Sequence, residues 1–351
     1  MAHWITKTLT TFLLLLPLTA CTESTSTGQD GSGQPKGRLA TVLGRGKVIC
    51  GVSGELPGFS FVDQDGKYSG LDVDVCRAIA AALFDNPDAV EYRNLNAKER
   101  FTALQTGEVD VLSRNTTWTM SRDTSVGLDF APIVFFDGQG IMVKQASNIK
   151  TLADLKDKSI CIQTGTTTEQ SLTDQMQKRG IPYKPVVFED VNTTFATYAE
   201  GRCDGVTADR SQLISRRTTL PNPGEHVILP DVLSKEPLAP AVASGDSAWA
   251  DAVRWTIFSL LEAEELGITS QNIGQFTTSK DPTVRRFLGM EGELGKGMGV
   301  ANDFAARIIK HVGNYEEIYD RNLGPQTKLN LPRGQNNLWT QGGLLFSPPF
   351  R

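Results

Sequence analysis

The sequence predicts an α/β fold made of two lobes that are joined by two hinge strands. Segments rich in β-branched residues alternate with segments of helical periodicity, an order typical of parallel sheets covered by helices. The alternation runs through the first part of the chain, stops, and restarts at residue 160. Two apolar, extended stretches, residues 140–144 and 239–244, stand where the chain would cross between the two parts.

In the first part, short runs rich in valine predict strands, and longer amphipathic runs predict helices. The expected strands are residues 47–52, 90–95 and 109–112, and the expected helices are residues 72–84 and 97–106. Gly107 follows the second helix, in a position where glycine commonly ends a helix. Strands that alternate with helices in this way predict a parallel sheet.

The second part repeats this order. Its expected strands are residues 160–163, 185–189 and 205–208, and its expected helices are residues 168–179 and 193–200. A third section is mainly helical, with helices expected at residues 247–266, 282–288, 302–312 and 315–322. Two crossings imply that this section returns to the first lobe. We therefore expect lobe 1 to comprise residues 39–142 and 243–351, and lobe 2 to comprise residues 143–242.

The composition is that of an ordinary globular protein, and it argues against several functions. The 351 residues include 35 basic and 40 acidic ones, a formal net charge of −5, so the basic surface that nucleic acid requires is missing. The three histidines, His3, His226 and His311, lie far apart and no HExxH or CxxC motif occurs, so we expect no metal and no cofactor. No GxSxG motif occurs either, and no acid–base pair indicates an enzyme.

The N-terminus reads as an export signal. A short basic start precedes an apolar run of about ten residues, too short to span a bilayer of about 30 Å, so residues 1–20 predict a signal peptide. The ending Leu-Thr-Ala-Cys resembles the lipobox of bacterial lipoproteins, which implies cleavage before Cys21 and its lipidation. A plain signal peptide with an incidental cysteine is the alternative. Residues 21–38 are rich in Ser, Thr, Gly and Gln and predict a flexible tether.

Export changes how the remaining cysteines are interpreted, because disulfides persist outside the cytoplasm. Four cysteines allow three pairings, and closeness in sequence favours Cys50 with Cys76 and Cys161 with Cys203. Four buried free thiols are the alternative.

The loops after the expected strands are the candidate binding site, because ligands of open α/β sheets bind beyond the carboxyl ends of the strands. Residues 113–122 contain hydroxyls, an amide and two arginines. The planar fork of Arg122 matches a carboxylate in two parallel hydrogen bonds, and Thr117 and backbone amides add donors. The structural alternative is that Arg122 pairs with Asp123 or Asp129.

Two further loops supply an anion-accepting helix start and a carboxylate. Thr166 and Glu169 fit a capping box, and Gly165 lets a ligand approach the free N–H groups there. Asp209 follows a strand, where it would meet an ammonium group across the cleft. A plain N-cap and a salt bridge from Asp209 to Arg210 are the structural alternatives. Together the loops predict a site for a zwitterion, and a free α-amino acid is the obvious one.

Several stretches of the chain resemble the amino-acid-binding proteins of bacterial ABC importers. They are GLDVDVCRAIAAALF, AKERFTALQTGEVDVLSRNTTWTMSRD, GQGIMV, CIQTGTTTE, VVFE, GRCDGVTAD and NLWTQGGL, in the order that the family has them. The resemblance runs from about Lys47 to Arg351 and is to the general L-amino-acid and glutamate/glutamine/aspartate/asparagine binding subfamily. It implies the type II periplasmic-binding fold, with two Rossmann-like lobes that close on a ligand.

The resemblance also implies roles for residues of these loops. Arg122, Thr117 and Thr167 would hold the α-carboxylate of the ligand. The backbone oxygen of Asn115 and the carboxylate of Asp209 would take its α-ammonium group.

The expected side-chain pocket departs from that of many relatives. Ser53 matches a position used for side-chain selection, but the aromatic ring that many relatives carry near Leu56 or at Ala97 is missing. This departure argues against long basic side chains and fits a broader specificity. The candidates to meet an acidic side chain, which are otherwise solvated or ion-paired, are Arg114, Lys98 and Arg100.

The resemblance implies an extracytoplasmic protein that binds free L-amino acids, either acidic and amide ones or a broad range, and passes them to an ABC transporter permease. Ligand contacts on both lobes would stabilise the closed state. We expect a monomer that is not an enzyme and that meets the membrane only through its lipid anchor. The alternative is a periplasmic cyclohexadienyl (prephenate or arogenate) dehydratase, because some such enzymes resemble these proteins.

Overall fold

The structure, a computed structural model, describes residues 37–351 together with Met1. The expected signal peptide, Cys21 and most of the expected tether lie outside the described residues. Arg38, expected to be the last residue of the tether, is instead the first residue of helix α1 (Arg38–Arg45). Residues 37–351 lie within one compact unit.

The first sheet has five strands in the order β5-β1-β6-β15-β7. The strands are β1 (Val48–Val52), β5 (Val90–Asn94), β6 (Val111–Leu112), β7 (Leu128–Phe130) and β15 (Ala241–Ala243). β1 is parallel to β5 and β6, as the strand–helix alternation predicts. β15 runs antiparallel to β6 and β7, so the far edge of this sheet is mixed.

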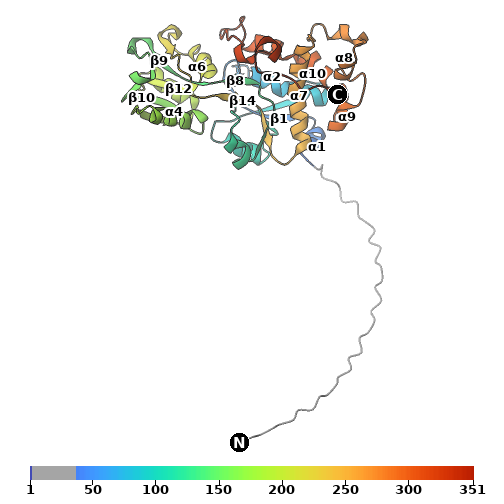
Figure 1. Ribbon diagram of the computed structural model, residues 1–351, viewed down its shortest axis with the longest axis horizontal. Coiled ribbons are helices and arrows are strands. Elements are labelled where there is room, and N and C mark those ends of the chain that lie inside the picture. The colour runs from blue at the N-terminus through green and yellow to red at the C-terminus, as the bar shows by residue number, and fades with distance from the viewer. Residues whose placement is uncertain (2–36) are drawn as a thin grey trace. The chain divides into compact units, whose positions relative to one another are not determined.

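The second sheet has the same number of strands, in the order β11-β10-β12-β9-β13. The strands are β9 (Gln139–Lys144), β10 (Ser159–Gln163), β11 (Lys184–Phe188), β12 (Gly205–Asp209) and β13 (His226–Ile228). β10 is parallel to β11 and β12, and β9 is antiparallel to β12 and β13. In Figure 1 these strands lie together with helices α4 and α6.

The two crossing strands lie a few residues earlier than expected. β8 (Phe135–Asp137) and β14 (Glu236–Leu238) pair antiparallel and run between the two groups of elements (Figure 1). Residues 140–144 belong instead to β9 and residues 241–243 to β15, each inside a sheet. The predicted positions of the crossing strands were wrong, because a short apolar segment has the same sequence pattern in a buried sheet strand as in a strand that connects two lobes. The expected lobe boundaries shift accordingly. The second sheet contains residues 139–142, which were expected in lobe 1, and the first sheet contains residues 241–242, which were expected in lobe 2.

Helices cover both faces of each sheet. The helices packed around the first sheet are α1, α2 (Leu71–Phe84), α3 (Arg100–Gln105), α7 (Ser247–Glu265), α8 (Pro282–Phe287), α9 (Leu294–Met298), α10 (Phe304–Val312) and α11 (Tyr315–Asn322). The largest core lies among β1, α2, α7, α10 and α11, and contains Trp249 and Tyr319. The return of α7 to this core places the C-terminal section with the first sheet, as two crossings require.

The second sheet has a core on each face. α4 (Thr167–Lys178) packs on one core through Leu172 and Met176. α5 (Val191–Ala199) and α6 (Arg210–Arg217) pack on the other through Phe195 and Leu213. The sequence did not predict helices α1 and α6, because their segments are short and polar. For the same reason it did not predict a small sheet made of β2 (Glu55–Leu56), β3 (Ser60–Val62) and β4 (Tyr68–Ser69).

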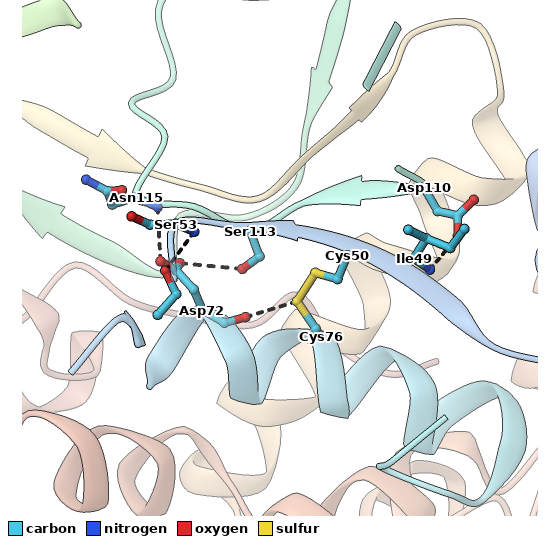
Figure 2. The surroundings of a disulfide bond; sticks show 9 residues. Ile49, Cys50, Ser53, Asp72, Cys76, Asp110, Ser113 and Asn115 are labelled. Atoms are coloured by element: carbon cyan, nitrogen blue, oxygen red, sulfur yellow. Dashed lines mark hydrogen bonds between the residues drawn. A yellow bond between two sulfur atoms is a disulfide. The ribbon is translucent and has the colours of Figure 1, made fainter. Parts of the chain in front are cut away.

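Two disulfides confirm the predicted pairing. Cys50 in β1 is bonded to Cys76 in α2, which ties the second strand of the first sheet to the helix that packs on it (Figure 2). Cys161 in β10 is bonded to Cys203, which precedes β12. Each sheet therefore has one covalent link inside its own core.

None of the helices in residues 37–351 combines the length and the apolar character that a membrane crossing demands.

Changing Cys161 and Cys203 together to serine is expected to lower the free energy of unfolding by about 4 kcal/mol, because the bond closes a loop of 42 residues in the unfolded chain. Urea unfolding of the ligand-free mature protein measures the loss. Cys50→Ser/Cys76→Ser is the matched variant, and its loss is expected to be slightly smaller because its loop spans 26 residues. Equal unfolding midpoints for wild type and both variants would contradict a stabilising role.

Candidate functional site

A pocket of about 480 Å³, counted with the solvent at its mouth, lies where the strands of the two sheets end. It is lined by Ser53, Glu55, Leu56, Arg100, Arg114, Asn115, Thr117, Arg122, Gln163, Thr166, Thr167, Thr168, Val191, Asp209, Gln212 and Arg216. β1 ends just before Ser53, β10 ends at Gln163, and β12 ends at Asp209. The structure brings together all seven residues predicted for the site: Arg122, Thr117, Asn115, Thr167, Asp209, Ser53 and Arg114. Their roles toward a ligand stay a prediction.

Arg122 is a buried guanidinium that forms no salt bridge with any carboxylate of residues 37–351. It lies in a short π-helical segment, η1 (Ser121–Ser125), and is 7% exposed. Its Nη1 donates to the backbone oxygen of Thr117 at 2.8 Å, which orients the fork. Asp123 accepts instead from Trp118, and Asp129 from Ser244, so the predicted alternative pairings of Arg122 are not formed. Burial lowers the pKa of Arg122, and the charges of Glu236 and Asp209 oppose that shift.

Arg114 is a second buried guanidinium in the same loop. It is 6% exposed, and its Nε donates to the backbone oxygen of Leu95 at 2.7 Å. Burial lowers its pKa to about 10, although Asp72 and Glu55 act in the opposite direction. Among residues 37–351, Arg114 has no carboxylate within salt-bridge distance. Its terminal nitrogens therefore remain available to an anion in the pocket.

Arg100 and Lys98, the other two cations proposed to meet an acidic side chain of the ligand, differ in their location. Arg100 lies in the pocket wall, where it donates to Thr116 Oγ1 at 3.3 Å and to the Gly165 backbone oxygen at 3.4 Å. Its Nε is buried without a partner among the described residues. Lys98 instead lies outside the pocket and pairs with exposed Glu189 at 2.6 Å, so it is not a site residue.

Asp72 holds the loop that carries these arginines. It lies in the first turn of α2, and its carboxylate accepts from the Asn115 backbone N–H at 3.1 Å and from the Ser113 hydroxyl at 3.5 Å (Figure 2). Asn115 has φ of 32°, a strained conformation that the bond from its N–H supports. Burial raises the pKa of Asp72 to about 6, and the bonds from Asn115 and Ser113 oppose this shift. The disulfide Cys50–Cys76 anchors the same helix to β1, so the loop rests on a rigid base (Figure 2).

The start of α4 faces the pocket from the second sheet. Thr166 is the N-cap and accepts from the Glu169 N–H. The reciprocal half of the predicted capping box is absent, because Glu169 accepts instead from the Thr164 hydroxyl and the Gly165 N–H. Gly165 has φ of 75°, and a Cβ there would come within 3.3 Å of the Ala97 backbone oxygen. The glycine thus permits close contact between the two sides of the pocket.

Asp209 is a buried carboxylate at the end of β12. It accepts from the Asn115 side-chain amide at 3.5 Å, across the pocket. Arg210 donates instead to the Leu229 backbone oxygen, so the alternative salt bridge from Asp209 is not formed. Burial raises the pKa of Asp209 well above its ordinary value, and the charges of Asp137 and Glu236 raise it further. The charge of Arg100 and the bond from Asn115 oppose this shift, but among residues 37–351 Asp209 has no cation within salt-bridge distance.

The sequence did not identify Glu236, Glu55 or Arg216 as site residues. Glu236, in crossing strand β14, accepts from the hydroxyls of Thr117 at 2.6 Å and Thr167 at 2.8 Å. Glu55 accepts from Asn192 through its side chain at 2.9 Å, and from Arg216 through its backbone at 3.0 Å. No motif marks these residues, and only the position of Glu236 beside an expected crossing hinted at a role.

Several of these hydrogen bonds join the two sides of the pocket. Asn115 to Asp209, Arg100 to Gly165, and Arg216 to Glu55 each link the first sheet's elements to the second's. Ser215 adds a bond to the Pro57 backbone oxygen at 2.7 Å. The structure therefore has its two halves in contact around the pocket.

The chain is similar in sequence to known proteins over most of its length. The sequence model of the bacterial extracellular solute-binding proteins, family 3, matches residues 48–274. The chain is 50% identical over 315 residues to the general L-amino acid-binding periplasmic protein AapJ of Rhizobium johnstonii, covering 89% of this chain and 92% of AapJ. It is 48% identical over 314 residues to the glutamate/glutamine/aspartate/asparagine-binding protein BztA of Rhodobacter capsulatus, covering 89% and 93%.

A solved structure is similar over nearly the same length. It is an ABC transporter / periplasmic binding protein from Brucella ovis with glutathione bound, 48% identical, with a TM-score of 0.87. The match covers 89% of this chain and 99% of that one. It confirms the predicted type II periplasmic-binding fold.

Asp72→Asn is expected to change how stability depends on pH. The pKa of Asp72 is about 6 in the folded chain against an ordinary 3.8, so its charged form is disfavoured by folding and stability increases as pH falls from above 6 to below 4. Asparagine lacks this dependence. The stability of the variant relative to wild type should therefore fall by about 2 kcal/mol between about pH 7.5 and 4.5.

Urea unfolding at both pH values measures this difference. Asp65→Asn, at an exposed loop position, controls for the loss of one carboxylate. A difference between Asp72→Asn and wild type that is constant across the pH range would contradict the assigned cause.

Proposed function

The chain belongs to the bacterial extracellular solute-binding proteins of family 3, and on that premise we propose that it binds free L-amino acids outside the cytoplasm and delivers them to an ABC transporter permease. The observation that carries the proposal is the pocket itself. It opposes two guanidiniums, those of Arg114 and Arg122, to the buried carboxylate of Asp209, and none of the three forms a salt bridge within residues 37–351, which suits a zwitterion. The names of AapJ and BztA, both amino-acid-binding proteins, support the same class of ligand.

The carboxylate and the ammonium group of the amino acid, which share one carbon, would be held by different groups of the pocket. Arg122 would take the α-carboxylate in a bidentate pair, helped by the free N–H groups at the start of α4. Asp209 and the backbone oxygen of Asn115 would take the ammonium group. Because these groups come from both sheets, the ligand would bind well only when the two halves are closed.

The side chain of the ligand would meet Arg114. Its guanidinium is buried and its terminal nitrogens have no carboxylate partner in the described chain, so a carboxylate or amide oxygen would satisfy them. Arg100 adds a second positive charge to the same wall, and Ser53 adds a hydroxyl. We therefore propose acidic and amide amino acids as the preferred ligands, within a broader range.

Other parts of the proposal concern the rest of the chain. We propose that Cys21 carries a lipid anchor, that residues 21–37 act as a tether, and that the protein works as a monomer whose lobes close as units. We also propose that it releases its ligand unchanged. The dehydratase alternative is not favoured, because the relatives of about 50% identity are named as binding proteins.

Glutathione is a second candidate ligand. The protein from Brucella ovis is described with glutathione bound. Its γ-glutamyl end carries an ammonium group and a carboxylate on one carbon, as a free amino acid does, so the same groups of the pocket would hold that end.

A thermal-shift panel of the twenty amino acids and reduced glutathione, on mature protein freed of copurified ligand, tests the proposal. A ligand at 100 times its Kd stabilises the folded state by about 2.7 kcal/mol, which raises Tm by about 4 °C or more. Arg122→Ala should weaken the best ligand about 100-fold or more by calorimetry, because it leaves the ligand carboxylate unpaired. Arg254→Ala, at an exposed pair with Asp251, is the matched control and should bind normally. If no compound of the panel shifts Tm, the proposal fails.

Asp209→Asn should weaken the best amino acid about 10-fold to 100-fold, because the buried ammonium loses its charged partner. The analogue of that amino acid without its amino group should lose little affinity. Calorimetry with both ligands measures the two losses. Equal losses would show that Asp209 does not contact the ammonium group.

A further inference from the structure

Glu236 joins the two sides of the pocket through a single carboxylate oxygen. It is 1% exposed and lies in the crossing strand β14, opposite Asp137 of β8. Its Oε2 accepts from Thr117 at 2.6 Å and from Thr167 at 2.8 Å, one from each side of the pocket. Its Oε1 accepts from the Ser234 hydroxyl. The carboxylate thus accepts from three hydroxyl groups, and two of them, those of Thr117 and Thr167, line the pocket.

Hydrogen counting determines what the two threonines offer to a ligand. A hydroxyl has one proton to donate and two lone pairs to accept with. A carboxylate oxygen only accepts, so both threonine protons point to Glu236 and the lone pairs face away from it. In this state neither hydroxyl donates to a ligand carboxylate, and both can accept from an N–H group.

The two hydroxyl oxygens are side by side. Thr117 Oγ1 and Thr167 Oγ1 are 3.4 Å apart, with both protons directed to the same atom. Two acceptor oxygens at this spacing suit a group that carries several N–H donors. The buried carboxyl groups of Asp209 and Asp137 lie near Glu236, and their mutual repulsion also favours a cation here.

We propose that Glu236 is a positioning residue that fixes the hydroxyls of Thr117 and Thr167 as acceptors for the ammonium group of the ligand. This inference rests on the proposed function. It changes the expected roles of Thr117 and Thr167, because the resemblance to the family assigns both threonines to the α-carboxylate. With their protons committed to Glu236, the carboxylate depends on Arg122 and on the N–H groups that begin α4. A ligand without an ammonium group would leave the two oxygens unsatisfied.

Glu236→Leu and Glu236→Gln separate orientation from charge. Leucine removes the acceptor and frees both hydroxyl protons, so affinity for the best amino acid should fall about 10-fold or more relative to its analogue without the amino group. Glutamine loses the charge but keeps an oxygen that can accept from both threonines, with its NH2 group toward Ser234. The ratio of the two affinities should therefore stay within about threefold of wild type in Glu236→Gln.

Calorimetry with the amino acid and its deaminated analogue gives that ratio, and circular dichroism checks the fold. Arg254→Ala, whose partner is Asp251 and which does not line the pocket, is the control and should leave the ratio unchanged. If Glu236→Leu does not fold, Thr167→Val, at a half-buried position, should lower the ratio by removing one oxygen.

Three results would overturn the inference. The first is an equal loss for both ligands in Glu236→Leu, and the second is an unchanged ratio in Thr167→Val. The third is a Glu236→Gln protein that behaves like Glu236→Leu, which would mean that charge and not hydroxyl orientation matters. Failure of the proposed function is distinct, because wild type itself would then bind no amino acid.

Discussion

The burial of guanidinium groups without carboxylate partners is the constraint on which the site depends. Removing a cation from water is costly unless a charged or hydrogen-bonding partner compensates for it. Arg114 and Arg122 have one backbone acceptor each and no ion pair in the described chain, so their remaining donors face the pocket. The rest of the fold has to hold these groups in place against that cost. Asp72 fixes the loop from below, and the Cys50–Cys76 bond fixes the helix that carries Asp72.

The second side of the pocket presents the opposite condition. Asp209 is buried near other acidic groups, whose effect Arg100 offsets only in part, and within residues 37–351 its side chain accepts one long bond, from the Asn115 amide. Neither side is electrostatically complete, and a molecule with one anionic and one cationic group corrects both deficits together. Glu236 contacts both sides from the strand that connects them. The connecting strand β14 and the threonines proposed to contact the ligand are therefore parts of one hydrogen-bonded unit.

Much of this was accessible from the sequence, for a physical reason. Strand ends in parallel sheets collect at one edge, so the loops after β1, β6, β10 and β12 were expected to meet, and the pocket is lined by those loops. The disulfide pairing followed from closeness in the chain. Glu236 and Glu55 were missed because their roles arise from contacts between residues far apart in sequence, such as Glu236 with Thr117. The crossing strands were misplaced by a few residues because β8 and β14 have only three residues each, and no pattern separates them from the strands that follow.

The order in which the chain visits the two sheets has a consequence for biogenesis. All strands of the second sheet come from one continuous stretch, residues 139–228. The first sheet, in contrast, is complete only when β15 has been added to it. Its main core waits longer still, for α7, α10 and α11. A chain that emerges with its N-terminus first can complete the second sheet early. The first sheet stays incomplete, with its apolar surface exposed, until the C-terminal residues follow. The half that contains the first sheet is thus the first to begin folding and the last to complete it. It is therefore the half most exposed to aggregation or proteolysis during export.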